Sequence, residues 1–498
     1  MITKKLRFLP AILAAGYLAL AIPPTDSAPP PPPASSPHQP FAWDRDDFWE
    51  AIEARYGALL QAGCGEAAPA ARERLARARA IIDEHTADIL PPESPLFPEL
   101  EGLIFEAGPA VAACRSNVPD FLSLAADLRA FVKRQSERWD PDAPAARTIL
   151  YRLLYGSRAA VEEVILQTKG VVPVPAMLPG TAEPSATPAA SMRGVTVHSG
   201  DILVSRGGAA TSALISRGSD YPGNFSHIAF VYVDPATSTA RIIEAHIEQG
   251  VVVSTVDQYL ADKKLRVMLL RPRADLPALR QDPLLPHRAA ERAYRGATAG
   301  HIPYDFSMDY RDHAKLFCSE VASAAYAAEG VALWAGISRI STPGLRRWLW
   351  DLGVRHFETQ EPSDLEYDPQ LRVVGEWRDP GTLWKDHLDN AATEAMLEGA
   401  EAGARLASPW YLLPLGRAAK GWSALLNLAG KIGPVPEGMP AVVALRSLDY
   451  DNRHAAIARR LAEKAEAYRA AHGFLPPYWR LVQLAREAGV PGGRRSGD

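Results

Sequence analysis

The sequence predicts an α+β fold in which a sheet-containing middle region has helical regions on both sides. Apolar residues recur at helical spacing from Trp43 to about residue 168, and the period changes to two from Val195 onward. Helical patterns return beyond about residue 385. At 498 residues and 54.0 kDa the chain exceeds the size of one ordinary hydrophobic core, so we expect two or three domains.

Residues 1–21 have the pattern of a secretory signal peptide. Lys4 and Lys5 precede an apolar run over residues 8–20 that closes on the small-x-small pattern Ala-Leu-Ala. The run is too short to span a bilayer. We therefore expect an exported, periplasmic or extracellular protein, with an uncleaved N-terminal anchor as the alternative. Residues 22–40, which contain five consecutive prolines, are expected to form a Pro-rich linker.

Residues 41–170 are expected to form a helical domain with one disulfide. The chain has three cysteines, and two of them, Cys64 and Cys114, lie in this region. If the first three helices alternate in direction, both cysteines come to the same side of the domain, which allows a bond between them. An oxidising compartment would then leave Cys318 unpaired.

A second linker and a mixed domain follow the helical domain. Residues 171–193 are rich in Pro, Ala, Thr and Ser, which predicts a linker, and residues 194–385 form the next domain. Its expected strands are residues 195–204, 228–233, 241–246, 251–253, 266–270 and 371–377, and its expected helices are residues 289–297 and 318–329.

Residues 386–498 are expected to form a helical C-terminal region. Within it, residues 410–428 combine tryptophan, tyrosine and leucine in a way that could make a lipid-contacting face, although packing in a core is the alternative. Pro414 and Gly416 interrupt this stretch, so it is not expected to span a membrane.

The charge distribution argues against nucleic acid as a partner. The formal net charge is -4 and the sequence pI is about 6.3. Lysine and arginine are scattered singly and form no basic stripe, which a nucleic-acid-binding surface requires.

Short polar motifs in the middle region carry the candidate chemistry. Cys318, in Phe-Cys-Ser-Glu, stands at the start of an expected helix, where the N-terminus and a neighbouring imidazole would both favour a thiolate. His227, in Ser-His-Ile, is the candidate base. Asp201, Tyr304 and Asp305 could line a cleft or bind substrate, but structural roles are favoured because Asp after Gly is ordinary turn chemistry.

The hairpin around residues 234–239 predicts a partner for His227. If Val233 faces Ala240, then His227 faces His246, and Glu244 lies one diagonal step away on the same face. We prefer Glu244 as the third member of the site, because a carboxylate within an apolar strand needs a partner. His246 remains the alternative.

The order of these motifs resembles that of the circularly permuted papain-like hydrolases of the YiiX and YaeF type, which are related to the NlpC cell-wall peptidases. In ordinary papain-like chains the cysteine precedes the histidine, whereas here it follows. The resemblance covers about residues 195–380 and implies Cys318 as nucleophile, His227 as base and Glu244 as the orienting group. Permuted relatives of the lecithin:retinol acyltransferase type place a histidine third, which keeps His246 open.

The resemblance implies a permuted papain-like, NlpC-type catalytic domain that cleaves an amide bond through a thioester. Its substrate would be a peptide, including cell-wall peptide, or an acyl or lipid amide. A lipid-directed acyl hydrolase or acyltransferase is the first alternative, and a non-catalytic binding module with an inert, buried Cys318 is the second. No cofactor is expected. A metal site formed by His227, Glu244, His246 and Glu248 is disfavoured, because no helical His-x-x-x-His spacing or cysteine pair supports it.

Overall fold

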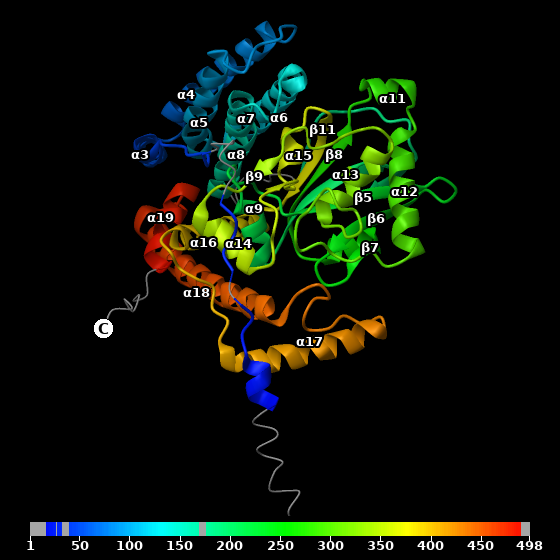
Figure 1. Ribbon diagram of the computed structural model, residues 1–498. Coiled ribbons are helices and arrows are strands. Elements are labelled where there is room, and N and C mark those ends of the chain that lie inside the picture. The colour runs from blue at the N-terminus through cyan, green and yellow to red at the C-terminus, as the bar shows by residue number, and fades with distance from the viewer. Residues whose placement is uncertain (1–15, 26, 32–38, 169–175, 490–498) are drawn as a thin grey trace, which may run out of the picture.

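The computed structural model describes residues 16–25, 27–31, 39–168 and 176–489 (Figure 1). At its centre lies a seven-stranded sheet with the order β1-β11-β8-β4-β5-β6-β7, in which all neighbouring strands are antiparallel. Helices pack on the sheet and on each other on either side of it, which confirms the α+β fold class. The sheet strands are β1 (Met177–Pro179), β4 (Ile202–Gly207), β5 (His227–Asp234), β6 (Thr239–His246), β7 (Gly250–Thr255), β8 (Lys264–Pro272) and β11 (Leu371–Arg378).

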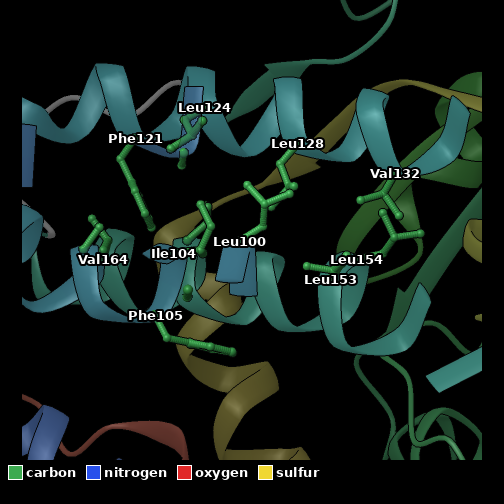
Figure 2. Close-up of a cluster of buried hydrophobic side chains, with 14 of the residues drawn as sticks. Leu100, Ile104, Phe105, Phe121, Leu124, Leu128, Val132, Leu153, Leu154 and Val164 are labelled. Carbon is green, nitrogen blue, oxygen red and sulfur yellow. The ribbon is translucent and has the colours of Figure 1, made fainter. Parts of the chain in front are cut away.

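The N-terminal helical region packs around its own apolar core. Its helices are α3 (Asp46–Ala62), α4 (Cys64–Glu84), α5 (Leu96–Ala113), α6 (Val118–Gln135), α7 (Pro144–Leu150) and α8 (Gly156–Gln167). A π-helical turn joins α7 to α8, so these two helices are continuous but locally widened. Leu100 and Ile104 of α5 meet Leu124 and Leu128 of α6, because residues three or four apart share one face of a helix (Figure 2).

The expected disulfide between Cys64 and Cys114 is present. Cys64 is the first residue of α4 and Cys114 directly follows α5, and the two helices pack against each other as an antiparallel pair. Their Cα atoms are 4.9 Å apart. The disulfide therefore joins the start of the second helix to the end of the third.

Removing this disulfide is expected to destabilise the helical region. In the chain-entropy account, closing a loop of 50 residues stabilises the folded state by roughly 4 kcal/mol, and strain lowers the yield. Cys64→Ser/Cys114→Ser should therefore lose about 2 to 4 kcal/mol of unfolding free energy in urea titrations. Cys318→Ala is the matched control and should lose far less. Equal stability of the double variant and wild type would refute a stabilising role.

The stretch expected to be a linker, residues 171–193, is partly sheet. Residues 171–175 lie outside the described part of the chain. β1 pairs with β11, while β2 (Ala189–Met192) pairs with β3 (Val195–His198). The Pro-rich composition hid these strands because each is only three or four residues long.

The strand expected over residues 195–204 is broken in two. β3 ends at His198, and β4 begins at Ile202. Gly200 lies between them with φ +100, and a Cβ there would lie 2.3 Å from the Pro286 side chain. A turn with a left-handed residue at this point accounts for the break.

Alternation along the strands gives the sheet two covered faces. Ile202, Phe230 and Ile243 share the face that carries α12 (Leu285–Ala299) and α13 (Cys318–Ala328). Leu203 and Val231 share the other, which the β2–β3 hairpin and α10 (Val256–Ala261) cover. Both faces are buried, which explains why these strands are apolar almost throughout.

Three further helices and a small hairpin surround the sheet. They are α9 (Ala210–Arg217), α11 (Pro277–Gln281) and α14 (Pro343–Asp351), with the one-turn helix α15 (Asp364–Tyr367) and the paired strands β9 (Ser338–Arg339) and β10 (Glu358–Thr359). The C-terminal region consists of α16 (Pro380–Glu401), α17 (Leu413–Leu428), α18 (Ala441–His472) and α19 (Tyr478–Gly489). Figure 1 shows α17 along the lower edge of the molecule, beyond α18.

A buried ionic network ties the helical regions to the sheet. Glu162 of α8 accepts hydrogen bonds from Arg266 of β8 and lies 3.1 Å from Nε2 of His387 in α16. Arg378 of β11 is 3.4 Å from the same carboxylate. All four side chains are nearly inaccessible to solvent. The helical regions therefore share an ionic core with the sheet.

The signal peptide expected over residues 1–21 falls mostly outside the described residues, and its cleavage stays a prediction. The described part of the 22–40 stretch contacts α14: Arg347 donates to the carbonyl of Ser27, and Arg346 donates to that of Pro30. Among the described residues, no helix has the length and apolar character needed to cross a bilayer.

Candidate active site

Cys318 is held at the first position of α13. Glu320 lies one turn into the helix, and its carboxylate accepts a hydrogen bond from the backbone N–H of Phe317 at 3.0 Å. This contact satisfies an N–H group that a helix start would otherwise leave without a partner. The Cys-Ser-Glu motif thus has a structural reason, since Glu320 fixes the turn that presents the cysteine.

His227, Glu244 and His246 form one connected group on two neighbouring strands. Nε2 of His227 lies 2.9 Å from one carboxylate oxygen of Glu244, and Nε2 of His246 lies 3.2 Å from the other. Ser254 of β7 donates to Glu244 at 3.0 Å. The pairing of Val233 with Ala240 is as expected, and it brings these groups together.

The surroundings shift the pKa values of the two imidazoles in opposite directions. Burial lowers the pKa of His227 more than its bond to Glu244 raises it. Burial is also the largest single effect on His246, but the hydrogen bond to Glu244 and the charge of Glu244 together outweigh it and raise the pKa. Burial alone would raise the pKa of Glu244, but hydrogen bonds from both histidines hold that pKa well below its usual range. His227 is therefore a neutral imidazole at neutral pH, and Glu244 is ionised.

A neutral His227 has the tautomer that a general base requires. When Nε2–H donates to Glu244, the lone pair resides on Nδ1, and no hydrogen bond among the described residues engages Nδ1. His246 contacts Glu244 but its ring centre is 5.7 Å from that of His227. Glu244 is thus the group that directly orients His227, and His246 holds Glu244 from the other side.

The Cys318 thiol lies beside the start of β5. α13 packs on β5, and the backbone N–H of Ile228, the residue after His227, lies within hydrogen-bonding reach of the sulfur. In the described part of the chain no hydrogen bond joins the sulfur to the His227 ring. The sulfur thus lies beside the residue that follows His227, and catalytic contacts often tighten only when substrate binds.

The thiol itself is not pre-ionised, contrary to the sequence-based expectation. Burial raises the pKa of Cys318 to about 11, more than the N–H groups of Ile228 and Ser319 lower it, and the nearby Glu361 carboxyl adds to the rise. The side chain is only 6% exposed. Desolvation therefore outweighs the helix N-terminus, and the resting site holds a neutral thiol.

The other expected site residues divide into two kinds. Asp201 is buried, and both its oxygens accept from Arg271 at 2.8 Å, so it joins β4 to β8 and is not free to bind substrate. Asp305 accepts from the backbone of Ser307 and Asp309 and shapes its own loop. Tyr304 lies close enough to Cys318 that a thiolate would raise its pKa further, beyond the effect of burial. Only Tyr304 remains a candidate cleft residue.

The same polar group could hold a metal ion. His227, Glu244 and His246 each offer one ligand atom, and these atoms all lie within 4.8 Å of one another. Two histidines and a glutamate are a ligand set that zinc uses. The helical spacing rule was the wrong test for this cluster, because strand pairing supplies the proximity. Glu248 is not part of it.

Two residues that the sequence analysis did not single out belong to the surroundings of the site. Ser254 fixes Glu244, and its place on β7 opposite Ile242 depends on strand register. Glu361 is buried near Cys318, where burial raises its pKa well above the usual value. A carboxyl in a loop far along the chain gives no sequence signal of this contact.

A cavity of about 610 Å³ lies elsewhere, among α3, α5, α8 and α19, and contains none of these groups.

Comparisons with known proteins identify the family of the middle region. Residues 196–375 match the family of permuted papain-like amidase enzymes, YaeF/YiiX, C92. The comparisons with curated proteins and with solved structures gave no match. The matched segment contains the sheet strands β4 to β8, most of β11, and helix α13, and it spans a little over a third of the chain. Residues 196–375 are therefore similar to the permuted papain-like amidase enzymes of the YaeF/YiiX family.

Proposed function

We propose that this protein is an exported cysteine hydrolase that cleaves an amide bond with Cys318 as nucleophile, His227 as base and Glu244 as the orienting group. The observation that carries the proposal is the contact of a neutral His227 with an ionised Glu244 beside a helix that begins at Cys318. The disulfide Cys64–Cys114 supports an oxidising compartment, and so does the signal-like N-terminus.

The chemistry follows from the resting protonation states. Because both the thiol and the imidazole are neutral, His227 takes the thiol proton as sulfur attacks the carbonyl carbon. The S–C bond forms, and backbone N–H groups at the start of α13 stabilise the oxyanion. His227 then gives the proton to the departing amine as the C–N bond breaks. Water, deprotonated by His227, attacks the thioester, and the proton returns to sulfur as the S–C bond breaks.

The substrate is an amide of a peptide, including cell-wall peptide, or of an acyl chain or lipid. A lipid-directed acyl hydrolase or acyltransferase is the second candidate, because the same thioester could pass its acyl group to water or to another acceptor. The feature that favours this second candidate is the exposed apolar surface around α17.

Trapping the acyl-enzyme tests the proposal. The purified protein is mixed with a panel of peptide amides and N-acyl amides, quenched in acid, and analysed by intact mass and peptide mapping. The expected result is a hydroxylamine-sensitive acyl adduct on Cys318 that is absent from Cys318→Ala, with turnover unaffected by a chelator. Turnover that persists in Cys318→Ala and is lost with EDTA would instead assign catalysis to a metal at His227, Glu244 and His246. Absence of adduct and turnover across the panel would favour a binding module.

A further inference from the structure

The exposed large apolar side chains are concentrated at one end of the molecule. In the described part of the chain, most of them lie in residues 17–22 and 410–432, the exceptions being Leu60, Ile89, Leu284 and Leu448. Leu428 is 87% exposed, more than any other of these side chains. Isolated exposed leucines are ordinary, but a contiguous apolar patch is typical of an interaction surface.

Helix α17 has two different faces. Ser423 is buried, and Gly416 on the same side of the helix comes close to Ala441 of α18, so this side packs on the protein. Side chains at positions 415, 422, 425 and 428 follow helical spacing on another side and are all exposed. The sequence therefore builds an amphipathic helix, and its apolar stripe has no partner among the described residues.

The N-terminal segment joins the same surface. Arg417 of α17 donates to the backbone carbonyls of Leu20 and Ile22 at 2.6 and 2.8 Å, and the Tyr17 hydroxyl donates to the carbonyl of Tyr411. Figure 1 shows the blue N-terminal helix projecting from beneath α17, away from the rest of the molecule. Before the expected removal of residues 1–21, Tyr17, Leu18, Leu20 and Ile22 extend the apolar stripe of α17; after it, the stripe of α17 itself remains.

The charge of this surface is one-sided. From residue 402 to 436 the sequence contains no aspartate or glutamate, and besides Arg405, which pairs with Asp351 of α14, it contains Arg417, Lys420 and Lys431. Tryptophan and tyrosine lie at its edge, at Trp410, Tyr411 and Trp422, and aromatic residues with cations are characteristic of helices at a lipid interface. Charge complementarity favours anionic lipid over a neutral or cationic surface.

We propose that the exposed apolar face of α17, which we call the α17 surface, docks on a bilayer that contains anionic lipid. The exposed leucines would enter the acyl boundary, while Lys431 stays among the headgroups. This inference does not depend on the proposed chemistry.

The α17 surface is connected to the candidate active site. The chain leaving α17 reaches Glu437, whose carboxylate lies 2.7 Å from His301, and Gly438, where a Cβ would lie 2.8 Å from the ring of Phe306. The same loop carries Tyr304, the neighbour of Cys318. Docking of the α17 surface would therefore bring the loop of residues 301–306, next to Cys318, close to lipid-borne substrates.

A fluorescent label on α17 tests the proposal. The full chain carries Cys318→Ala, which leaves only the bonded pair Cys64–Cys114, and receives one cysteine by Leu428→Cys, labelled with a polarity-sensitive dye. Leu284→Cys, also exposed but in the loop before α12, is the matched control. Vesicles of phosphatidylcholine with 30 mol% phosphatidylglycerol are then added. This composition is an experimental choice of roughly one anionic lipid in three, where surface attraction is strong.

The expected result is a blue shift and at least a threefold rise in emission for the label at 428, weaker with pure phosphatidylcholine, and none for the label at 284. Leu425→Glu in the Leu428→Cys chain should reduce the shift by at least half. Vesicle binding without a shift at 428 would mean attachment through the N-terminus alone and would overturn the proposal. A concentration-dependent shift without lipid, with a dimer in light scattering, would assign the surface to a second copy and would also overturn it.

Discussion

Replacing His227 by alanine is expected to lower the rate of amide hydrolysis by about 10²- to 10⁴-fold without unfolding the protein. The reason is the neutral resting site: with the pKa of Cys318 raised to about 11, almost no thiolate exists at pH 7.5, so a base must remove the proton during attack. Glu244 keeps its contacts with His246 and Ser254 in this variant, so the fold is expected to persist. Initial rates at pH 7.5 and thermal unfolding provide the measurement.

Two further variants make this result specific. His85→Ala removes an exposed histidine of the N-terminal helical region, paired with Asp88, and should hydrolyse substrate at the wild-type rate. Glu244→Gln keeps the shape of the orienting group but removes its charge, and it should lower the rate by less than His227→Ala does. Wild-type activity in His227→Ala would refute its role as base.

Replacing Glu162 by glutamine is expected to cost about 3 to 5 kcal/mol of unfolding free energy, because it removes the buried anion that Arg266 of β8 and Arg378 of β11 share. Although burial disfavours the charged form, Arg266 is the main cause that holds the pKa of Glu162 far below its usual range; His387 and Arg378 add to this. In this variant Arg266 loses its ion pair with Glu162 and keeps only the one with Asp386. Urea titration at pH 7 is the measurement.

The pH dependence of this effect has a defined sign. Because folding lowers the pKa of Glu162, the stabilisation is fully present above the unfolded value of about 4.5 and is lost as the pH falls toward the folded value. The difference between wild type and Glu162→Gln should therefore shrink below pH 4.5. Glu466→Gln, at an exposed pair with Arg469, should show no measurable loss at any pH. Equal stability of Glu162→Gln and wild type would contradict the structural role of the network.

The sequence predicted the catalytic region well because its signals are local. Two strands separated by a short polar turn determine a register, and the register places His227, Glu244 and His246 together. The change of period and the positions of the two cysteines near helix ends are equally local. The disulfide was predicted from the expected antiparallel packing of neighbouring helices. The prediction is confirmed, and Cys64 is the first residue of α4.

The features that were missed depend on tertiary burial. A helix N-terminus suggested an ionised Cys318, but the packing of α13 on the sheet makes desolvation the larger effect. The sequence left Asp201 as a possible substrate-binding residue. In the structure Arg271 of β8, which is far away in sequence, donates hydrogen bonds to both oxygens of Asp201. Periodicity also could not decide whether residues 410–428 face a core or solvent, because an amphipathic stripe looks the same in both cases.

The most direct test of the central claim, that Cys318 and His227 act as a pair, is the rate of Cys318 alkylation by iodoacetamide from pH 6 to 11 in wild type and His227→Ala. If His227 accepts the thiol proton, wild type should react at least tenfold faster at pH 7 to 8. The two curves should then converge as the pH approaches about 11, where the thiol of Cys318 ionises without help. Coincident curves over the whole range would show that the imidazole does not serve the thiol and would contradict the proposed mechanism.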